Sequence, residues 1–284
     1  MAVEKVAVIG AGIMGRGIAH VAALGGFCTR LYDVSEEMLK SAESDIKQNL
    51  AKAVARGIIT NDQEAACQRN LALQASVVNV VKNADLVIEA IPEKIELKTE
   101  LFAKLEPMCK PDVIFASNTS SLSVTEMAAV VSVPQRFVGM HFFNPVHKMK
   151  LVEIVRGLET SEETLLAVNN VAEKMGKETV TIRESPGFVT SRINALIGNE
   201  AFYMLQEGVA TAREIDKALR LGLNHPMGPF EMVDLVGLDT RLNILKFLHQ
   251  TLGEKYRPCP LMEQYVKAGR LGRKTGKGVY DYES

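Results

Sequence analysis

The pattern of apolar and polar positions predicts a buried sheet in the first two thirds of the chain. Apolar runs of strand length alternate with segments in which apolar residues recur on one face of a helix. The predicted strands are residues 6–9, 27–32, 71–74, 85–90, 113–116, 179–182 and two within 136–144 and 149–155. Alternating strands and helices favour right-handed crossovers, so we predict an α/β fold with a Rossmann-like, doubly wound parallel sheet.

The strand pattern disappears after residue 185. Residues 188–208 have the spacing of one long helix, Thr211 and Glu214 form a capping box, and two further helices are predicted after it. We therefore divide the chain into a domain of residues 1–184 and an all-helical domain of residues 185–284. The apolar surface of the 188–208 helix is broader than a lone surface helix needs, so a buried central helix and a dimer interface both fit.

The first predicted strand runs into three glycines at the spacing G-x-G-x-x-G, namely Gly10, Gly12 and Gly15. In a dinucleotide site such glycines permit a tight turn, leave room for a pyrophosphate and let the following helix pack closely on the strand. The phosphates then face the positive end of a helix that begins near Ile13. The spacing alone is weak support, because glycine-rich turns also occur for purely structural reasons.

The second predicted strand ends at Asp33, at the distance from the glycines that dinucleotide sites use. A carboxylate there accepts hydrogen bonds from the adenosine ribose and repels a 2′-phosphate. The sequence therefore predicts NAD rather than NADP as the cofactor, bound on the turn Gly10-Ala11-Gly12-Ile13-Met14-Gly15.

The composition is that of an ordinary enzyme, with 47% hydrophobic residues and a formal net charge of -1 over 284 residues. This balance gives no charge signature for nucleic acid or for an anionic membrane surface. No apolar stretch is long enough to span a bilayer, and charged residues flank the first strand where a signal peptide has none. The four cysteines form no C-x-x-C pair, which favours reduced thiols in a cytoplasmic protein and no metal site.

Four glycine or polar positions lie where predicted strands end, namely Gly10, Asp33, Glu93 and Ser120. Doubly wound sheets bind their ligands outside the carboxyl ends of the strands. We therefore expect these four positions to converge on one edge of the sheet and to form a single site.

A histidine and a carboxylate lie on the next two predicted strands. The loop that contains Pro145 should fold Glu153 back beside His141. A histidine among apolar residues is more often a satisfied core residue than a catalyst. Here, however, Ser120 ends a neighbouring strand, and a base held by an orienting carboxylate is the arrangement that proton transfer requires.

Several segments together resemble the L-3-hydroxyacyl-CoA dehydrogenases, and most of all the short bacterial 3-hydroxybutyryl-CoA dehydrogenases. They are residues 117–121 (SNTSS), 141–145 (HFFNP), 151–153 (LVE), 185–188 (SPGF), 225–229 (HPMGP) and 272–278 (GRKTGKG). The resemblance covers essentially the whole chain. It implies the reversible, NAD-dependent oxidation of the 3-hydroxyl group of a short acyl-CoA thioester, and a homodimer formed by the helical domain.

The resemblance also implies roles for particular residues. His141 would be the general base, Glu153 would orient it, and Ser120 would hydrogen-bond the reacting oxygen. Asn144 would support the nicotinamide and the loop behind His141, and it is also a candidate substrate contact. The remaining implied cofactor contacts are Glu93 and Lys98 at the nicotinamide ribose, Asn118, and Lys274 from the far C-terminus.

Basic residues lie on one face of the helix predicted from Ser35 to about Arg56. A solvated face is the simpler interpretation. In the family that the chain resembles, the corresponding helix meets the adenosine end of CoA, so Asn49, Lys52 and Arg56 are the candidate substrate contacts.

One candidate position departs from the family pattern. Many members have asparagine within Val-Asn-Arg after Pro-Gly-Phe, whereas this chain has Ser191 in the sequence Val-Thr-Ser-Arg. In the family this asparagine is a hydrogen-bond donor near the thioester. Serine donates one hydrogen bond but has a shorter reach, so the donor could be Ser191 itself, a water molecule or Asn194.

Two other functions compete with this interpretation. One is a dehydrogenase of free 3-hydroxy acids, but such enzymes use a lysine in the helical domain, whereas this chain offers His141 and Glu153. The other is a non-catalytic NAD-binding relative, against which the intact Ser120, His141 and Glu153 argue.

Overall fold

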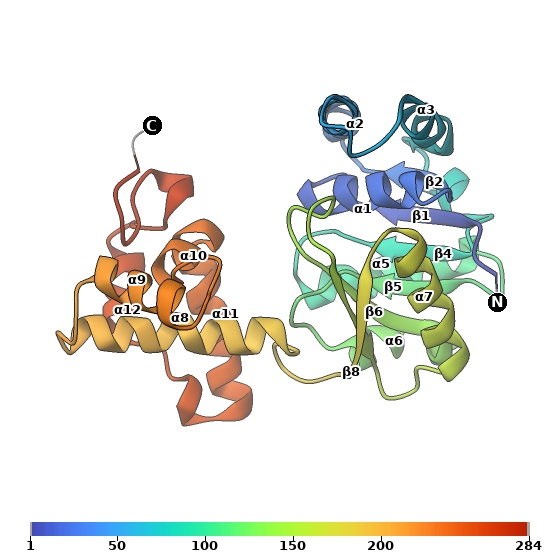
Figure 1. The fold of residues 1–284 in the computed structure, drawn as a ribbon. Helices are drawn as coiled ribbons and strands as arrows, with labels where there is room; N and C mark the ends of the chain where they lie inside the picture. Colours follow the sequence, from blue (N-terminus) through green and yellow to red (C-terminus); the bar gives the residue numbers. More distant parts are fainter. Residues whose placement is uncertain (1, 283–284) are drawn as a thin grey trace. The chain divides into compact units, whose positions relative to one another are not determined.

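The computed structural model describes residues 2–282, which fall into two compact units that divide after Glu184 (Figure 1). The first unit contains all the named strands, and the second is helical. The change in pattern that the sequence shows after residue 185 thus corresponds to a change in architecture.

An eight-stranded sheet forms the centre of the first unit, in the order β3-β2-β1-β4-β5-β6-β7-β8. Its strands are β1 Lys5–Ile9, β2 Cys28–Tyr32, β3 Leu71–Gln74, β4 Leu86–Glu89, β5 Ile114–Ser117, β6 Phe137–Phe142, β7 Leu151–Arg156 and β8 Glu178–Arg183. The strand order steps outward in both directions from β1, which is the doubly wound arrangement that the sequence predicts.

Among the described strands every pairing is parallel except that between β6 and β7, which is antiparallel. The parallel arrangement predicted for the sheet holds at the other pairs, and this pair is the fold-back predicted for the loop that contains Pro145, with Glu153 opposite His141. The reason is the connection: residues 143–150 form a short loop, whereas a parallel pair needs a crossover of a dozen or more residues.

Helices cover both faces of the sheet (Figure 1). They are α1 Ile13–Leu24, α2 Glu36–Ala55, α3 Asn61–Asn70, α4 Val77–Val81, α5 Ile95–Leu105, α6 Val124–Ala128 and α7 Glu162–Lys174. Apolar residues of α1 and α7, such as Ile18 and Val168, share one core with Val138 and Met140 of β6. Phe102 of α5 packs edge-on against Phe137, the β6 residue whose side chain alternates to the opposite face.

The predicted helix of residues 35–56 is confirmed as α2. The Ser35 hydroxyl accepts a hydrogen bond from the Met38 amide at its start, and Gly57 follows its end with a φ of 67°. Its core face carries the buried Leu39 and Leu50, whereas Met38 is 39% exposed.

The second unit is a bundle of helices α8 Thr190–Gln206, α9 Ala212–Gly222, α10 Pro229–Val236, α11 Leu238–Leu252 and α12 Pro260–Lys267. The capping box of Thr211 and Glu214 is present. Helix α8 packs against the other four helices and buries Phe202 in their common core. The interpretation of residues 188–208 as a buried central helix is therefore supported, although the helix begins two residues later than predicted.

Candidate active site

The turn after β1 has the local geometry that a dinucleotide site requires. Gly10 has a φ of 104°, and a Cβ there would lie 2.6 Å from the Ala90 carbonyl oxygen. A Cβ on Gly15 would lie 1.7 Å from the Gly10 carbonyl oxygen, so only glycine allows α1 to approach β1 this closely. Gly12 instead faces open space, because no atom outside its own stretch of chain lies within 4 Å of the position that a Cβ would take.

The start of helix α1 is open to an anion. Gly12 is its N-cap residue, so no side chain caps the helix, and its first turn contains no acidic residue. The first amide groups of a helix have no partner within the helix and carry its positive partial charge. A pyrophosphate placed over Gly12 would satisfy these amides, and the residues present therefore fit a bound dinucleotide.

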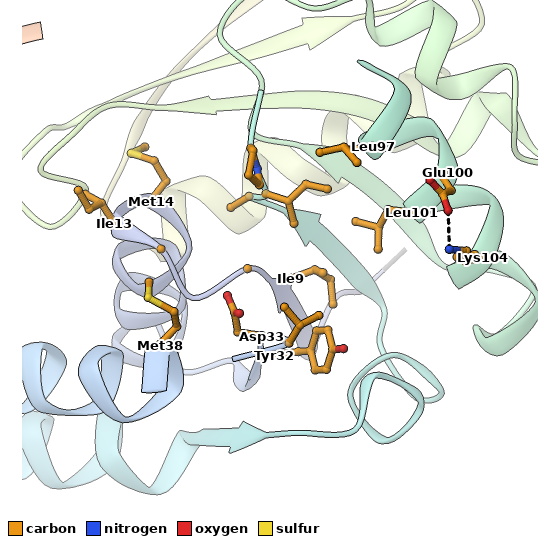
Figure 2. A pocket seen from close by; sticks show the side chains of 16 residues that line it. Ile9, Ile13, Met14, Tyr32, Asp33, Met38, Leu97, Glu100, Leu101 and Lys104 are labelled. Atoms are coloured by element: carbon orange, nitrogen blue, oxygen red, sulfur yellow. Dashed lines mark hydrogen bonds and ion pairs between the residues drawn. The ribbon is translucent and has the colours of Figure 1, made fainter. Parts of the chain in front are cut away.

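A cavity of about 740 Å³ opens beside this turn (Figure 2). Its walls include Ile13 of α1 together with Leu97 and Leu101 of α5. The Asp33 carboxylate lies in the same cavity and accepts hydrogen bonds from the Ala11 amide at 2.7 Å and the Ser35 amide at 2.9 Å. Apolar walls suit an adenine ring, and the anchored carboxylate suits the hydroxyls of its ribose.

His141 of β6 and Glu153 of β7 are direct partners in the antiparallel pair. The His141 Nδ1 atom lies 2.7 Å from Glu153 Oε2. His141 is 6% exposed and Glu153 is fully buried. Because a carboxylate only accepts hydrogen bonds, this contact places the ring proton on Nδ1, which makes Nε2 the basic nitrogen of the neutral ring.

A second buried network joins the ends of β4 and β5. Glu93 Oε1 accepts hydrogen bonds from the Thr119 hydroxyl at 2.6 Å, from the Ser120 amide at 2.8 Å and from the Ser120 hydroxyl at 3.3 Å. The other oxygen of Glu93 lies 2.9 Å from the ammonium of Lys98. Lys98 also donates to both oxygens of the fully buried Glu89, at 2.8 and 2.9 Å.

The two carboxylates of this network have opposite pKa shifts. Burial raises the pKa of Glu89, and the charge and hydrogen bonds of Lys98 offset this only in part. Burial also acts to raise the pKa of Glu93, but the charge of Lys98 and the hydrogen bonds from Thr119 and Ser120 outweigh it, so that pKa is lowered. Glu93 is therefore the more firmly ionised carboxylate, at the position closest to Ser120.

Asn118 links the end of β5 to β6. Its side-chain oxygen accepts a hydrogen bond from the Phe142 amide at 2.9 Å, and its own amide donates to the Glu89 carbonyl oxygen at 2.9 Å. The strand that carries His141 is thereby tied to the segment that carries Ser120.

The loop after His141 borders a smaller cavity of about 130 Å³, lined by Asn144, His147, Arg16, His20 and Asn49. The buried Lys177 donates hydrogen bonds to the carbonyl oxygens of Val146 and, at 2.9 Å, Met149, which fastens this loop to the sheet. Burial is the main cause that lowers the pKa of His20 to about 4, and nearby His147 and Lys177 lower it further.

Two family models cover the chain almost completely. The model for the NAD binding domain of 3-hydroxyacyl-CoA dehydrogenase matches residues 5–185, and the model for its C-terminal domain matches residues 187–282. The chain belongs to the 3-hydroxyacyl-CoA dehydrogenase family.

Full-length relatives agree with this assignment. A "Probable 3-hydroxybutyryl-CoA dehydrogenase" of Bacillus subtilis is 49% identical over 100% of this chain and 99% of its own length. The 3-hydroxybutyryl-CoA dehydrogenase of Bradyrhizobium diazoefficiens is 46% identical over 99% of this chain and 96% of its own length. The crystal structure of (S)-3-hydroxybutyryl-CoA dehydrogenase from Ralstonia eutropha superposes with a TM-score of 0.96 at 40% identity, covering 100% of both chains.

The structure of this family member separates the candidate CoA contacts. Asn49 lines the smaller cavity, but Lys52 and Arg56 are exposed and line none of the cavities described above. Lys52 extends along α2 toward Gln48, with 3.4 Å between Nζ and Oε1. Lys52 and Arg56 therefore lie on a solvated face of α2, which is the simpler of the two interpretations that the sequence allows.

Two candidate site residues, the substrate contact Ser191 and the cofactor contact Lys274, lie in the helical unit. Ser191 is in the first turn of α8 and is partly buried. The Lys274 ammonium lies 2.6 and 2.7 Å from the two carboxylate oxygens of Asp239, at the start of α11. Lys274 is thus already ion-paired within its own unit.

Sequence reasoning missed Glu89, Ser117 and Thr119, which are all fully buried. The signal was present, because Glu89 is an acidic residue at the carboxyl end of an otherwise apolar strand, where a buried charge needs a partner. Within residues 2–282 no group of three or more metal-ligating side chains could hold a metal ion. Nor is any described helix long and apolar enough to cross a membrane.

Proposed function

We propose that this chain catalyses the reversible, NAD-dependent oxidation of (S)-3-hydroxybutyryl-CoA to acetoacetyl-CoA. Relatives at 46% and 49% identity over their full length carry the name of this activity. The observation that carries the proposal is the buried pair of His141 and Glu153, whose Nδ1 and Oε2 atoms are 2.7 Å apart, on the same sheet as the nucleotide turn.

In this mechanism Nε2 of His141 removes the proton of the 3-hydroxyl group. The Glu153 carboxylate, 2.7 Å from Nδ1, stabilises the imidazolium that results. The Ser120 hydroxyl donates a hydrogen bond to the reacting oxygen, and to do so it turns away from Glu93, to which it now donates at 3.3 Å. Bound NAD supplies the hydride acceptor.

The residues proposed to hold the cofactor follow the sheet edge. The turn of residues 10–15 would bind the pyrophosphate and Asp33 the adenosine ribose. Glu93, held by Lys98, would accept hydrogen bonds from the nicotinamide ribose. Asn118, Asn144 and Lys274 complete the proposed set, with Lys274 first released from Asp239.

The proposed substrate contacts are Ser120 and Asn144 at the acyl group and Asn49, Lys52 and Arg56 along CoA. Ser191 is proposed as the hydrogen-bond donor near the thioester. Asn49 has the strongest support of the CoA set, because it lines a cavity together with Asn144.

We also propose a cytoplasmic homodimer. All four cysteines are free thiols, which suits a reducing compartment. The helical unit exposes large apolar side chains, including Ile193 at 53%, Leu221 at 76% and Leu223 at 65%, which suits an interface. Sedimentation of the purified protein should give the mass of two chains, whereas a stable monomer at working concentration would refute the dimer.

The oxidation of NADH in the presence of acetoacetyl-CoA tests the function, with free acetoacetate as the matched comparison. Turnover with the thioester alone supports the proposal, turnover with the free acid alone supports the free-acid dehydrogenase, and turnover with neither supports the non-catalytic relative. The variant His141→Gln should lose at least about a hundredfold in kcat, because general-base catalysis contributes about 10² to 10⁴. A loss of only a few-fold would exclude His141 as the base.

A further inference from the structure

The buried carboxylate Glu89 has no role in the mechanism described above. It lies at the carboxyl end of β4, is fully buried, and accepts hydrogen bonds from the Ile91 amide at 2.7 Å, the Ser117 hydroxyl at 2.5 Å and Lys98. Replacing a buried ion pair by well-packed apolar side chains of similar volume is often neutral or stabilising, so such a pair is weak evidence of a role in stability. An ion pair kept at this position therefore calls for a reason other than stability.

The hydrogen bonds of Lys98 suggest that reason. An ammonium group has three protons, and three carboxylate oxygens lie within 2.9 Å of Nζ, two from Glu89 and one from Glu93. The side chain of Lys98 is only 1% exposed. All three protons of the Lys98 ammonium are thus directed at these two glutamates.

Glu93, in contrast, contacts the buried Lys98 and is also partly exposed to solvent. One of its oxygens contacts the buried ammonium, the other accepts from Thr119 and Ser120, and its side chain is 36% exposed. Thr119 and Ser120 hold one oxygen of Glu93, Lys98 holds the other, and Lys98 is in turn held by Glu89.

We propose that Glu89 is a positioning residue for the cofactor site, which acts through Lys98 to aim Glu93 at the nicotinamide ribose. Lys98 is the link through which Glu89 acts on Glu93. This inference rests on the NAD site of the proposed function and adds to it the buried residues that set its geometry.

The experiment measures the Kd of NADH by its fluorescence, together with the Tm, in Glu89→Gln, Lys98→Met and the double variant. Each single variant should raise the Kd at least about tenfold, the effect of one lost charge-assisted hydrogen bond. The double variant leaves no unpaired charge at Glu89 or Lys98, so its Tm should recover toward that of the wild type. Its Kd should stay at the value of Lys98→Met, because one oxygen of Glu93 still lacks its ammonium partner.

A matched control lies at the opposite end of the same strand. Asp85 directly precedes β4, pairs with Lys110, and accepts hydrogen bonds from the amides of Glu4 and Lys5 at 2.8 and 2.7 Å. Asp85→Asn should lower the Tm and leave the Kd of NADH within about twofold of the wild type, since that end of the sheet carries no part of the site.

Three results would overturn the inference. They are a Kd of Glu89→Gln that stays within about twofold of the wild type, a Kd of the double variant that recovers together with its Tm, and a Kd that Asp85→Asn raises as much as Glu89→Gln does. These measurements need no acyl-CoA. A wild-type protein that binds NADH without reducing acetoacetyl-CoA would therefore refute the proposed reaction and leave this inference intact.

Discussion

Replacing Glu153 by glutamine separates the orienting carboxylate from the base it holds. Glutamine has nearly the volume of glutamate, and its side-chain oxygen can still accept the hydrogen bond from Nδ1 of His141, now 2.7 Å from Glu153 Oε2. The fully buried position therefore keeps its packing. What the variant loses is the negative charge that faces the imidazolium formed when the hydroxyl proton is taken.

The expected loss follows from the difference between a charged and a neutral hydrogen bond. A hydrogen bond to a charged group contributes about 1.5 to 3 kcal/mol, against about 1 for a neutral pair. The difference of about 0.5 to 2 kcal/mol raises the barrier to alcohol oxidation and lowers kcat about two- to thirtyfold. This loss is smaller than the hundredfold or more expected for His141→Gln, because the base itself remains.

The assay is the steady-state oxidation of 3-hydroxybutyryl-CoA, combined with NADH binding and thermal unfolding. We expect kcat to fall as calculated while the Kd of NADH and the Tm stay close to the wild type. A loss of NADH affinity comparable to the loss of kcat would refute this reasoning, because Glu153 would then support the fold of the site rather than the charge on His141.

Three further predictions follow from local geometry. Gly12→Ala should fold normally, because its Cβ enters open space, and should weaken NADH binding, because that space is where the pyrophosphate is proposed to lie. Gly15→Ala should lower the Tm, because its Cβ would lie 1.7 Å from the Gly10 carbonyl oxygen. Equal Tm values for the two variants would contradict this prediction. Ser191→Ala should lower kcat/KM with acetoacetyl-CoA, and an unchanged value would remove Ser191 from the site. Burial acts to raise the pKa of Asp85, but hydrogen bonds from Lys110 and two amides outweigh it and lower the pKa. The contribution of Asp85 to stability is therefore complete above the ordinary carboxyl pKa of about 4 and is lost as the pH falls through the lowered pKa. The free energies of unfolding of Asp85→Asn and the wild type, measured in urea, should differ by about 1 to 3 kcal/mol at pH 7 and become equal at low pH.

Local pattern was enough to predict much of the fold. Alternating apolar runs and helical spacings gave the eight strands and the change at residue 185, because burial imposes the periods of strand and helix directly on the residues. The glycine turn and the position of Asp33 were also predictable, because a positive φ at Gly10 and the end of a strand are local properties of the chain. His141 and Glu153 could also be paired, because a short loop brings neighbouring strands together in register.

The tertiary structure alone decided the contacts between segments that are far apart in the sequence. The hydrogen bonds of Glu89 and Ser117, 28 residues apart, and the ion pair of Lys274 with Asp239, 35 apart, arise from how the strands and helices pack. The exposure of Lys52 on α2 likewise depends on which neighbours the helix meets. The sequence by itself determined which residue types stand at the strand ends. Only packing determined which partners hold them, because a buried charge acquires its partner from whatever element the fold brings within about 3 Å.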